Sequence, residues 1–435
     1  MLTRCTRDFL PAILIACGLA LGGSSSGGIW ANLVVTLIAL ASLALLLVQR
    51  RHLPVSPGLI VLCLGIVALP LLQLLPLPPT VWTQLPGRSE IALGFSQSGL
   101  ALPWLPIALD QDAALSSLNA LTAPLAMLMV GSGASPFGRR LALQVVLGIA
   151  MISILLGIAQ VWPGLDLSLR PYEVTNPDMA VGLFANRNHL ATLLLAAIPI
   201  AAILTIRRAV AILLCMVLAG GVIVTRSDAG AALLLPVLAA SLLFVRPLWR
   251  TSRVVWASFG VLALIAAAVV GWGVLQQQRG LTALGAEQRR PAIISTTLTA
   301  ARDYLPFGAG AGSFRQIYPR YEDQAQTSQE FINHAHSDYA EVVLEYGVPG
   351  LLIAFATWLW FGRRVLAHPG GHGRAGAVII GVILVHSLVD YPLRTAAIAM
   401  LAALAATMLD QSRQVGSPGK YREPGDGEES LRISL

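Results

Sequence analysis

Charged residues are scarce in this sequence. They make up 12% of its 435 positions, while 56% of the residues are hydrophobic. In a typical soluble globular domain roughly 25% of all residues are charged. The deficit excludes an ordinary soluble enzyme, because so much apolar surface must face something other than water. We therefore expect much of the chain to lie in lipid.

Cysteine is also scarce, with four residues at Cys5, Cys17, Cys63 and Cys215. Their spacing fits no metal-binding pattern and the chain has no HExxH motif, so we expect no metal site and no disulfides. The segment LIAC at 14–17 resembles a lipoprotein cleavage box. Because many apolar segments follow it, we interpret the first segment as an uncleaved helix.

Long apolar runs recur along the whole chain, each near the length of about 20 residues that spans a bilayer as a helix. They predict an all-α, polytopic integral membrane protein with a single transmembrane domain over residues 1–410. We expect about twelve helices, near 9–24, 30–49, 56–76, 113–131, 140–162, 188–206, 209–225, 230–246, 254–275, 343–361, 375–389 and 393–410.

The net charge of +7 comes from short basic clusters between the apolar runs. With the N-terminus in the cytoplasm, every such cluster falls on the cytoplasmic side, as the positive-inside rule requires. These clusters are not interleaved with aromatic residues, so we expect no nucleic-acid partner. The external segments are then 77–112, 163–187, 276–342 and 390–394, and residues 276–342 form a large loop before the third-last helix. The polar tail 411–435 is predicted to be a disordered cytoplasmic end.

The last part of this loop, NHAHSDYAEVVLEYGVPG at 333–350, concentrates ionisable residues. A helix beginning near Asp338 would place Asp338, Glu341 and Glu345 on one face. The plain interpretation is a capped helix with acidic residues at its positive end. The functional one makes His334 and His336 proton acceptors tuned by these acids, with Glu341 as the expected partner of His336.

Other polar residues are expected at the same external side, each with a structural alternative. Arg289 and Arg290 suit phosphate recognition or an ion pair, and Arg226 suits a buried site or a pair with Asp228. The glycines of LPFGAGAGSF (305–314) suit a tight turn that lets backbone approach closely, to the chain or to a ligand. Helix ends supply the remaining candidates, Asn186, Arg187 and Asp390.

Three segments together resemble the O-antigen ligase and O-antigen polymerase family of bacterial membrane glycosyltransferases. They are His-Ser-x9-Gly-x2-Gly at 336–350, GLFANRNHLA at 182–191, and Arg290 followed by Pro-x-Gly-x-Gly-x-Gly-x-Phe at 306–314. The resemblance covers about residues 140–410. It implies a bacterial inner-membrane enzyme whose active site faces the periplasm.

The resemblance also implies the chemistry. A glycan on undecaprenyl pyrophosphate would be transferred, with inversion, to a hydroxyl of lipid A–core, of another lipid-linked glycan or of a protein. No nucleotide sugar, cofactor or metal is implied, because pyrophosphate is the leaving group. His336 would be the catalytic histidine, and Arg226 and Arg290 would hold the pyrophosphate. Arg187, Asn186, Arg289, His334, Glu341 and Asp390 would complete the substrate site.

Two other classes of function compete with a transferase. A transporter of small anions such as bicarbonate would carry ionisable residues near the middle of the membrane and internal repeats. The scarce charges lie instead at the predicted helix ends, and no repeat is evident. A scaffold of an export complex would not depend on His336. We therefore favour the transferase and, within it, a ligase over a polymerase or a protein glycosylase.

Overall fold

The computed structural model describes residues 2–25, 28–49, 53–162, 169–205, 207–245, 285–323, 332–367 and 369–411. Within these ranges the chain is helical, and an isolated bridge between Leu77 and Leu105 is its one extended pairing. The all-α prediction is therefore confirmed for the described residues. The predicted helix 254–275 and the tail after Gln411 lie outside them.

Six helical segments of the described residues are long and apolar enough to cross a membrane. They are α3 (Ile29–Val48), α7 (Gln111–Ala120) with α8 (Thr122–Ser132), α9 (Pro136–Gln160), α10 (Arg187–Leu204), α12 (Asp228–Ala239) with η2 (Ala240–Val245), and α16 (Asp338–Leu366). Shorter apolar helices are α2 (Leu10–Leu21), α4 (Pro57–Gln73), α11 (Arg208–Val224), α17 (Gly371–His386) and α18 (Ala396–Gln411). These helices agree with a polytopic membrane protein. The count of twelve spans stays a prediction.

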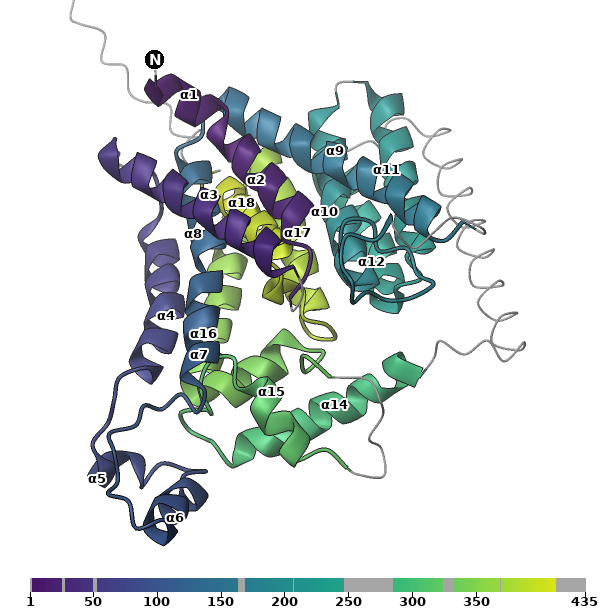
Figure 1. The fold of residues 1–435 in the computed structure, drawn as a ribbon. Helices are drawn as coiled ribbons and strands as arrows, with labels where there is room; N and C mark the ends of the chain where they lie inside the picture. The colour runs from purple at the N-terminus through teal and green to yellow at the C-terminus, as the bar shows by residue number, and fades with distance from the viewer. Residues whose placement is uncertain are drawn as a thin grey trace, which may run out of the picture.

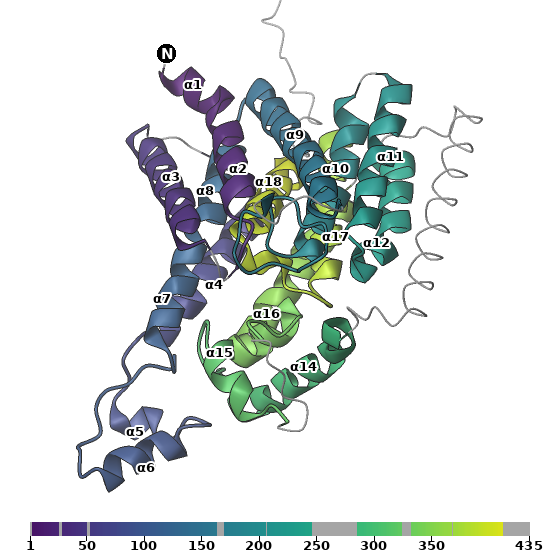
Figure 2. The same cartoon turned by 45° about the vertical axis from the view of Figure 1, so that its right-hand side comes forward.

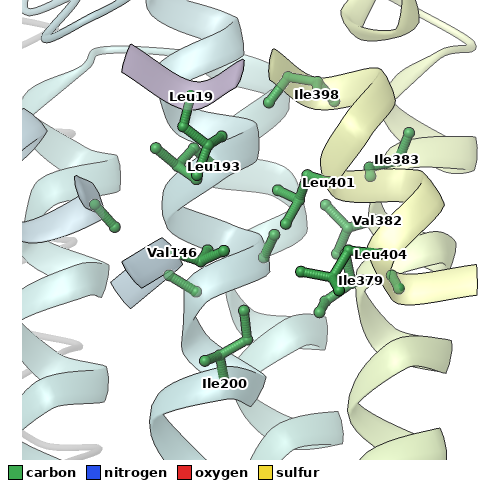
Figure 3. Packing of buried hydrophobic residues seen from close by; sticks show 14 of the residues in the cluster. Leu19, Val146, Leu193, Ile200, Ile379, Val382, Ile383, Ile398, Leu401 and Leu404 are labelled. Atoms are coloured by element: carbon green, nitrogen blue, oxygen red, sulfur yellow. The ribbon is translucent and has the colours of Figure 1, made fainter. Parts of the chain in front are cut away.

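The core of the bundle lies around α10, which packs against α9, α11, α12 and α17 (Figure 1). The 18 residues of α10 are 83% buried, whereas the equally apolar segment Gln111–Ser132 is 28% buried. Leucine and isoleucine side chains of α10, α17 and α18 interlock here, including Leu193, Ile379 and Leu401 (Figure 3). Since lipid is itself apolar, this close packing rather than exclusion of water holds the helices together.

The helices begin and finish at two opposite ends of the bundle. At one, which we call the basic end, Ser135 N donates to Arg7 O, and Arg364 pairs with the buried carboxylate of Asp410. Arg139 and Gln411 also meet there. At the other, the site end, α10 and α16 begin and α17 ends. The basic clusters of the described residues thus share one end, as the charge pattern predicts.

The first α-helix, α1 (Leu2–Asp8), lies at the basic end, and two further units extend beyond the site end (Figures 1 and 2). One holds the short helices α5 (Pro79–Trp82) and α6 (Ser89–Gln97), with Trp82 fully buried and its Nε1 donating to Pro103 O at 2.8 Å. The other holds α14 (Gly285–Arg302), α15 (Phe314–Ile317) and η3 (Tyr318–Arg320), packed on α16 around Phe314 and Leu344. The described part of the predicted loop 276–342 is therefore largely helical.

α16 is broken at Gly347, which takes φ 57° and ψ −140°. A Cβ at this glycine would lie 2.2 Å from Pro306 O, and the next residue, Val348, donates its N–H to the same carbonyl at 2.8 Å. Other residue types avoid this backbone conformation. The kink therefore lets the segment that follows α14 pack its backbone against α16. This close packing explains why the motif at 336–350 has a glycine at 347.

We expect Gly347→Ala to lower the stability of the protein by at least about 2 kcal/mol. The added methyl group would clash with Pro306 O, and the backbone conformation at this position disfavours any side chain. Gly362→Ala, in the same helix with nothing within 4 Å of the added Cβ, is the matched control. It should be neutral or stabilising by up to ~1 kcal/mol. Thermal unfolding of both purified variants in detergent measures this, and equal melting temperatures would contradict it.

Candidate functional site

Two loops meet where α16 begins at the site end. The Ser337 side chain caps α16 by accepting from Ala340 N at 3.3 Å, and it donates to Ser387 O at 3.3 Å. Asp338 N donates to Ser387 O at 3.0 Å and to Asp390 O at 3.1 Å. The helix begins at Asp338, as the predicted acidic face requires, and therefore before the start of the expected span 343–361. The segment 332–337 is fixed against 387–395.

Tyr391 lies at the centre of the site, where three histidine rings pack against it. The ring centroids lie 4.5 Å away for His334, 5.1 Å for His189 and 5.3 Å for His336. Asn186, which caps α10, donates from Nδ2 to the phenol oxygen at 3.4 Å. Burial raises the pKa of Tyr391 above its usual range, so it remains a neutral phenol.

His336 faces the carboxylate of Asp390, with 3.9 Å between Nδ1 and Oδ1. The side chain of Asp390 is fully buried, whereas that of His336 is 19% exposed. Burial would raise the pKa of Asp390, but the imidazoles of His336 and His189 and the charge of Arg290 hold it well below its usual range. These neighbours therefore favour the ionised form of Asp390 beside a partly accessible histidine.

The predicted arginines divide into those near this carboxylate and those elsewhere. Arg290, on α14, lies close enough to affect the ionisation of Asp390. Arg187 is buried, with Nη1 3.4 Å from Met179 Sδ and its backbone N–H donating to Asn176 Oδ1. Arg226 is exposed in the turn between α11 and α12, beside the early turns of α10, since a Cβ on Gly230 would touch Ala191.

Two of the remaining predictions concern residues without a described contact. The side chain of Arg289 lies outside the described part of the structure. Among the described ion pairs none joins Arg226 to Asp228, so the structural alternative for Arg226 finds no support there. The structure thus brings together His334, His336, Glu341, Asp390, Asn186 and Arg290, and Arg187 follows Asn186 directly in the chain. No described hydrogen bond or ion pair joins Arg226 to this group.

The prediction that Glu341 pairs with His336 is wrong. Glu341 accepts from His334 Nδ1 at 2.9 Å and from Ala335 N at 3.0 Å, whereas the acid facing His336 is Asp390. His336 has a φ of 53°, a left-handed conformation that turns the chain between the two histidines. His334 and His336 therefore reach different acids despite their spacing of two.

Asp338, Glu341 and Glu345 do share one face of α16, as predicted, and all three meet Arg394. Its Nη1 lies 3.0 Å from Glu345 Oε2 and 3.5 Å from Glu341 Oε1, and its Nε lies 3.7 Å from Asp338 Oδ1. These carboxylates are buried, and the guanidinium is 20% exposed. A single arginine thus holds three acids at the start of a membrane helix.

The glycines of 305–314 have a structural role. Gly310 N donates to Glu345 O at 3.0 Å, and a Cβ on Gly308 would lie 2.4 Å from the same oxygen. Gln73 fills the remaining space, donating from Nε2 to Glu345 O and accepting from Ala311 N. The close approach is to the kink of α16, so the ligand-binding alternative for these glycines is not needed.

Tyr391 belongs to the site, although the sequence analysis did not single it out. The pattern DYPLR at 390–394 held a signal for it, because an aromatic ring lies between two charged residues in a short connection between apolar helices. Four histidines, His189, His334, His336 and His386, gather near Asp390 and Tyr391. No group of metal-ligating side chains occurs among the described residues, so this cluster offers hydrogen bonds and proton transfer.

Comparisons with known proteins identify part of the chain. Residues 213–355 match a family model described as O-antigen ligase. The matched region holds Arg226, Arg290, His334, His336 and Glu341, and Asp390 and Tyr391 follow it. A search of curated proteins finds no match. The match over this region agrees with the motif resemblance and supports the O-antigen ligase and polymerase family for this part of the chain.

Proposed function

We propose that the protein transfers a glycan from undecaprenyl pyrophosphate to an acceptor hydroxyl, at the periplasmic face of the bacterial inner membrane. The family supports glycosyl transfer of the O-antigen ligase or polymerase type in general. The donor and the side of the membrane are our proposal. The gathering of basic clusters at the end opposite His336 supports this orientation, with both termini in the cytoplasm.

The observation that carries the proposal is the arrangement of His336, Asp390 and Arg290. A partly exposed imidazole lies beside a buried carboxylate, and Arg290 lies close enough to that carboxylate to favour its ionised form. A carboxylate behind an imidazole orients it and stabilises its protonated form, which is how a general base is supported. The guanidinium offers charge-assisted hydrogen bonds to a pyrophosphate.

In the reaction we propose, the acceptor oxygen attacks the anomeric carbon from the face opposite the pyrophosphate. His336 takes the hydroxyl proton, and the imidazolium that forms is stabilised by Asp390. The bond between the anomeric carbon and the phosphate oxygen breaks, and its electron pair stays on that oxygen. Undecaprenyl pyrophosphate leaves, and the configuration at the sugar is inverted. Arginine neutralises the developing charge, so this scheme requires neither a metal nor a cofactor.

For the acceptor we propose lipid A–core, which makes the protein an O-antigen ligase. A second lipid-linked repeat unit, which would make it a polymerase, is the alternative, followed by a protein hydroxyl. The different-class alternative, an anion transporter, predicts ionisable groups in mid-membrane. The described site lies instead where helices begin and end, at residues 186–189, 334–345 and 386–394.

The first test is complementation of a strain lacking this chain with His336→Ala. We expect loss of glycan transfer by about 10²–10⁴-fold, because general-base catalysis contributes about this much. Surface polysaccharide is resolved on a gel, and protein levels are compared with His372→Ala, an exposed histidine at the basic end. Bare lipid A–core with accumulating lipid-linked polymer indicates a ligase, and core with a single repeat indicates a polymerase. A normal ladder would contradict the role of His336.

The second test compares arginines in purified protein with a lipid-linked donor. Arg290→Ala should lower kcat/KM for the donor by about 100-fold, because a charge-assisted contact to the leaving group is lost. The matched control is Arg302→Ala, an exposed arginine at the other end of α14, which should leave kcat/KM unchanged. Arg226→Ala is measured beside them. Equal effects of the Arg290 and Arg302 substitutions would exclude a donor contact at Arg290.

A further inference from the structure

A pocket opens at the basic end of the bundle, away from the site that holds His336. The ends of α1, α8, α9 and α18 surround it, and α1 lies beside the start of α9 there (Figures 1 and 2). Its volume is about 1510 Å³, larger than the roughly 300–1,000 Å³ of a typical small-molecule site. No residue of the proposed reaction lines it. The pocket therefore calls for an explanation of its own.

The backbone of α1 is fixed at this pocket from two sides. Ser135 N, at the start of α9, donates to Arg7 O at 3.1 Å, and Thr6 Oγ1 donates to Gln49 Oε1 at 3.2 Å. A Cβ at Gly138 would lie 2.1 Å from Arg7 O, so a glycine is needed for α1 to approach α9 this closely. The pocket is therefore built by packed helices rather than by a loose terminal segment.

The charge of the pocket is positive. Arg4, Arg7 and Arg139 line it, and Asp8 is the one acidic residue of its described lining. Asp8 is already engaged, since its Oδ2 lies 3.7 Å from Arg4 Nε and its Oδ1 accepts from Ser135 Oγ. Arg7 is exposed and Arg139 is half-buried. An anionic group in this pocket meets several guanidinium groups, whereas an ammonium group meets no unengaged carboxylate of the described lining.

Backbone acceptors at the end of α8 are engaged within the protein. Ser132 O accepts from Gln411 Nε2 at 2.6 Å, and Gln411 Oε1 accepts from Arg139 Nη2. Carbonyl groups at the end of a helix otherwise favour cations. Because Gln411 covers one of them, the arginines determine the charge that a ligand meets.

An apolar wall adjoins the arginines. Phe9 and Phe137 both line the pocket, with their ring centroids 5.9 Å apart in an edge-to-face arrangement. Phe9 is 47% exposed and Phe137 is 55% exposed, and Leu53 and Pro54 extend the same lining. A free phosphate gains nothing from these side chains. A phospholipid does, because its acyl chains begin a few bonds away from its phosphate.

We propose that this pocket binds an anionic phospholipid, whose phosphodiester lies among Arg4, Arg7 and Arg139 and whose acyl chains begin along Phe9 and Phe137. Arginine forms charge-assisted, bidentate hydrogen bonds with phosphate oxygens. Basic pockets between transmembrane helices bind anionic headgroups in the cytoplasmic leaflet, where the proposed orientation places this end. The lipid holds α1 against α9, and its binding does not depend on glycosyl transfer.

The first experiment measures selectivity for the headgroup. The full-length protein, freed of lipid in a neutral maltoside detergent, is titrated with dioleoyl phosphatidylglycerol, dioleoyl phosphatidylethanolamine or inorganic phosphate, and bound adducts are measured by native mass spectrometry. We expect phosphatidylglycerol to bind at least about fivefold more tightly than phosphatidylethanolamine. Equal affinities for the two lipids, or phosphate bound as tightly as phosphatidylglycerol, would overturn the proposal.

Matched arginine variants test the location. Arg7→Gln removes a cation of the pocket, whereas Arg208→Gln removes an exposed arginine at the start of α11, at the same end but outside the lining. Arg7→Gln should weaken phosphatidylglycerol binding by about fivefold, the usual contribution of one arginine, and Arg208→Gln should leave it unchanged. Both side chains are exposed, and melting temperatures check that both variants fold. Equal binding by the two folded variants would exclude this site.

A second pair of variants separates a lipid from a free anion. Phe137→Ala removes part of the apolar wall and should weaken phosphatidylglycerol binding by at least about threefold, without changing the binding of inorganic phosphate. Phe355→Ala removes the same side chain from an exposed position of α16 outside the lining and should change neither. Equal lipid binding by these two variants would contradict the placement of the acyl chains and overturn the proposal.

Discussion

The ion-pair cluster of Arg394 with Asp338, Glu341 and Glu345 is the interaction on which the site depends. It joins the start of α16 to the connection between α17 and α18, and so sets the positions of His334, Tyr391 and Asp390. Three buried carboxylates would repel one another without the guanidinium, and a buried charge without a partner is strongly destabilising. The cluster is therefore a structural necessity before it is a chemical one.

A second constraint fixes the same helix from the other side. Gly347 breaks α16, and the glycine turn of 305–314 packs its backbone against the break through Gly310 N and Glu345 O. The unit carrying α14 is thereby held at a set distance from α16, which brings Arg290 near Asp390. Motif residues that are far apart in the chain, Arg290, the glycines and Gly347, thus belong to one structural arrangement. Their joint occurrence follows from packing as much as from chemistry.

The sequence predicted an all-helical chain with several membrane-spanning segments, because apolar runs bounded by basic clusters report membrane insertion directly. The count of twelve spans stays a prediction. The face shared by Asp338, Glu341 and Glu345 also followed from helical spacing. It could not predict which acid serves which histidine, because that depends on the left-handed backbone of His336. Tyr391 was missed for a related reason. Its role arises from three rings brought together from α10, the 332–337 segment and its own loop, which no local pattern records.

The backbone turn at His336 gives the site two chemically different sides. His334 donates to Glu341, whereas His336 faces Asp390, and Tyr391 packs against both rings. Glycosyl transfer from a pyrophosphate needs this separation, since the leaving group demands positive charge while the nucleophile must lose a proton. Under the proposed function, Arg290 would meet the first demand, and His336 supported by Asp390 would meet the second. The spacing of two between the histidines lets one short segment serve both sides, because an extended or helical segment would not reverse direction there.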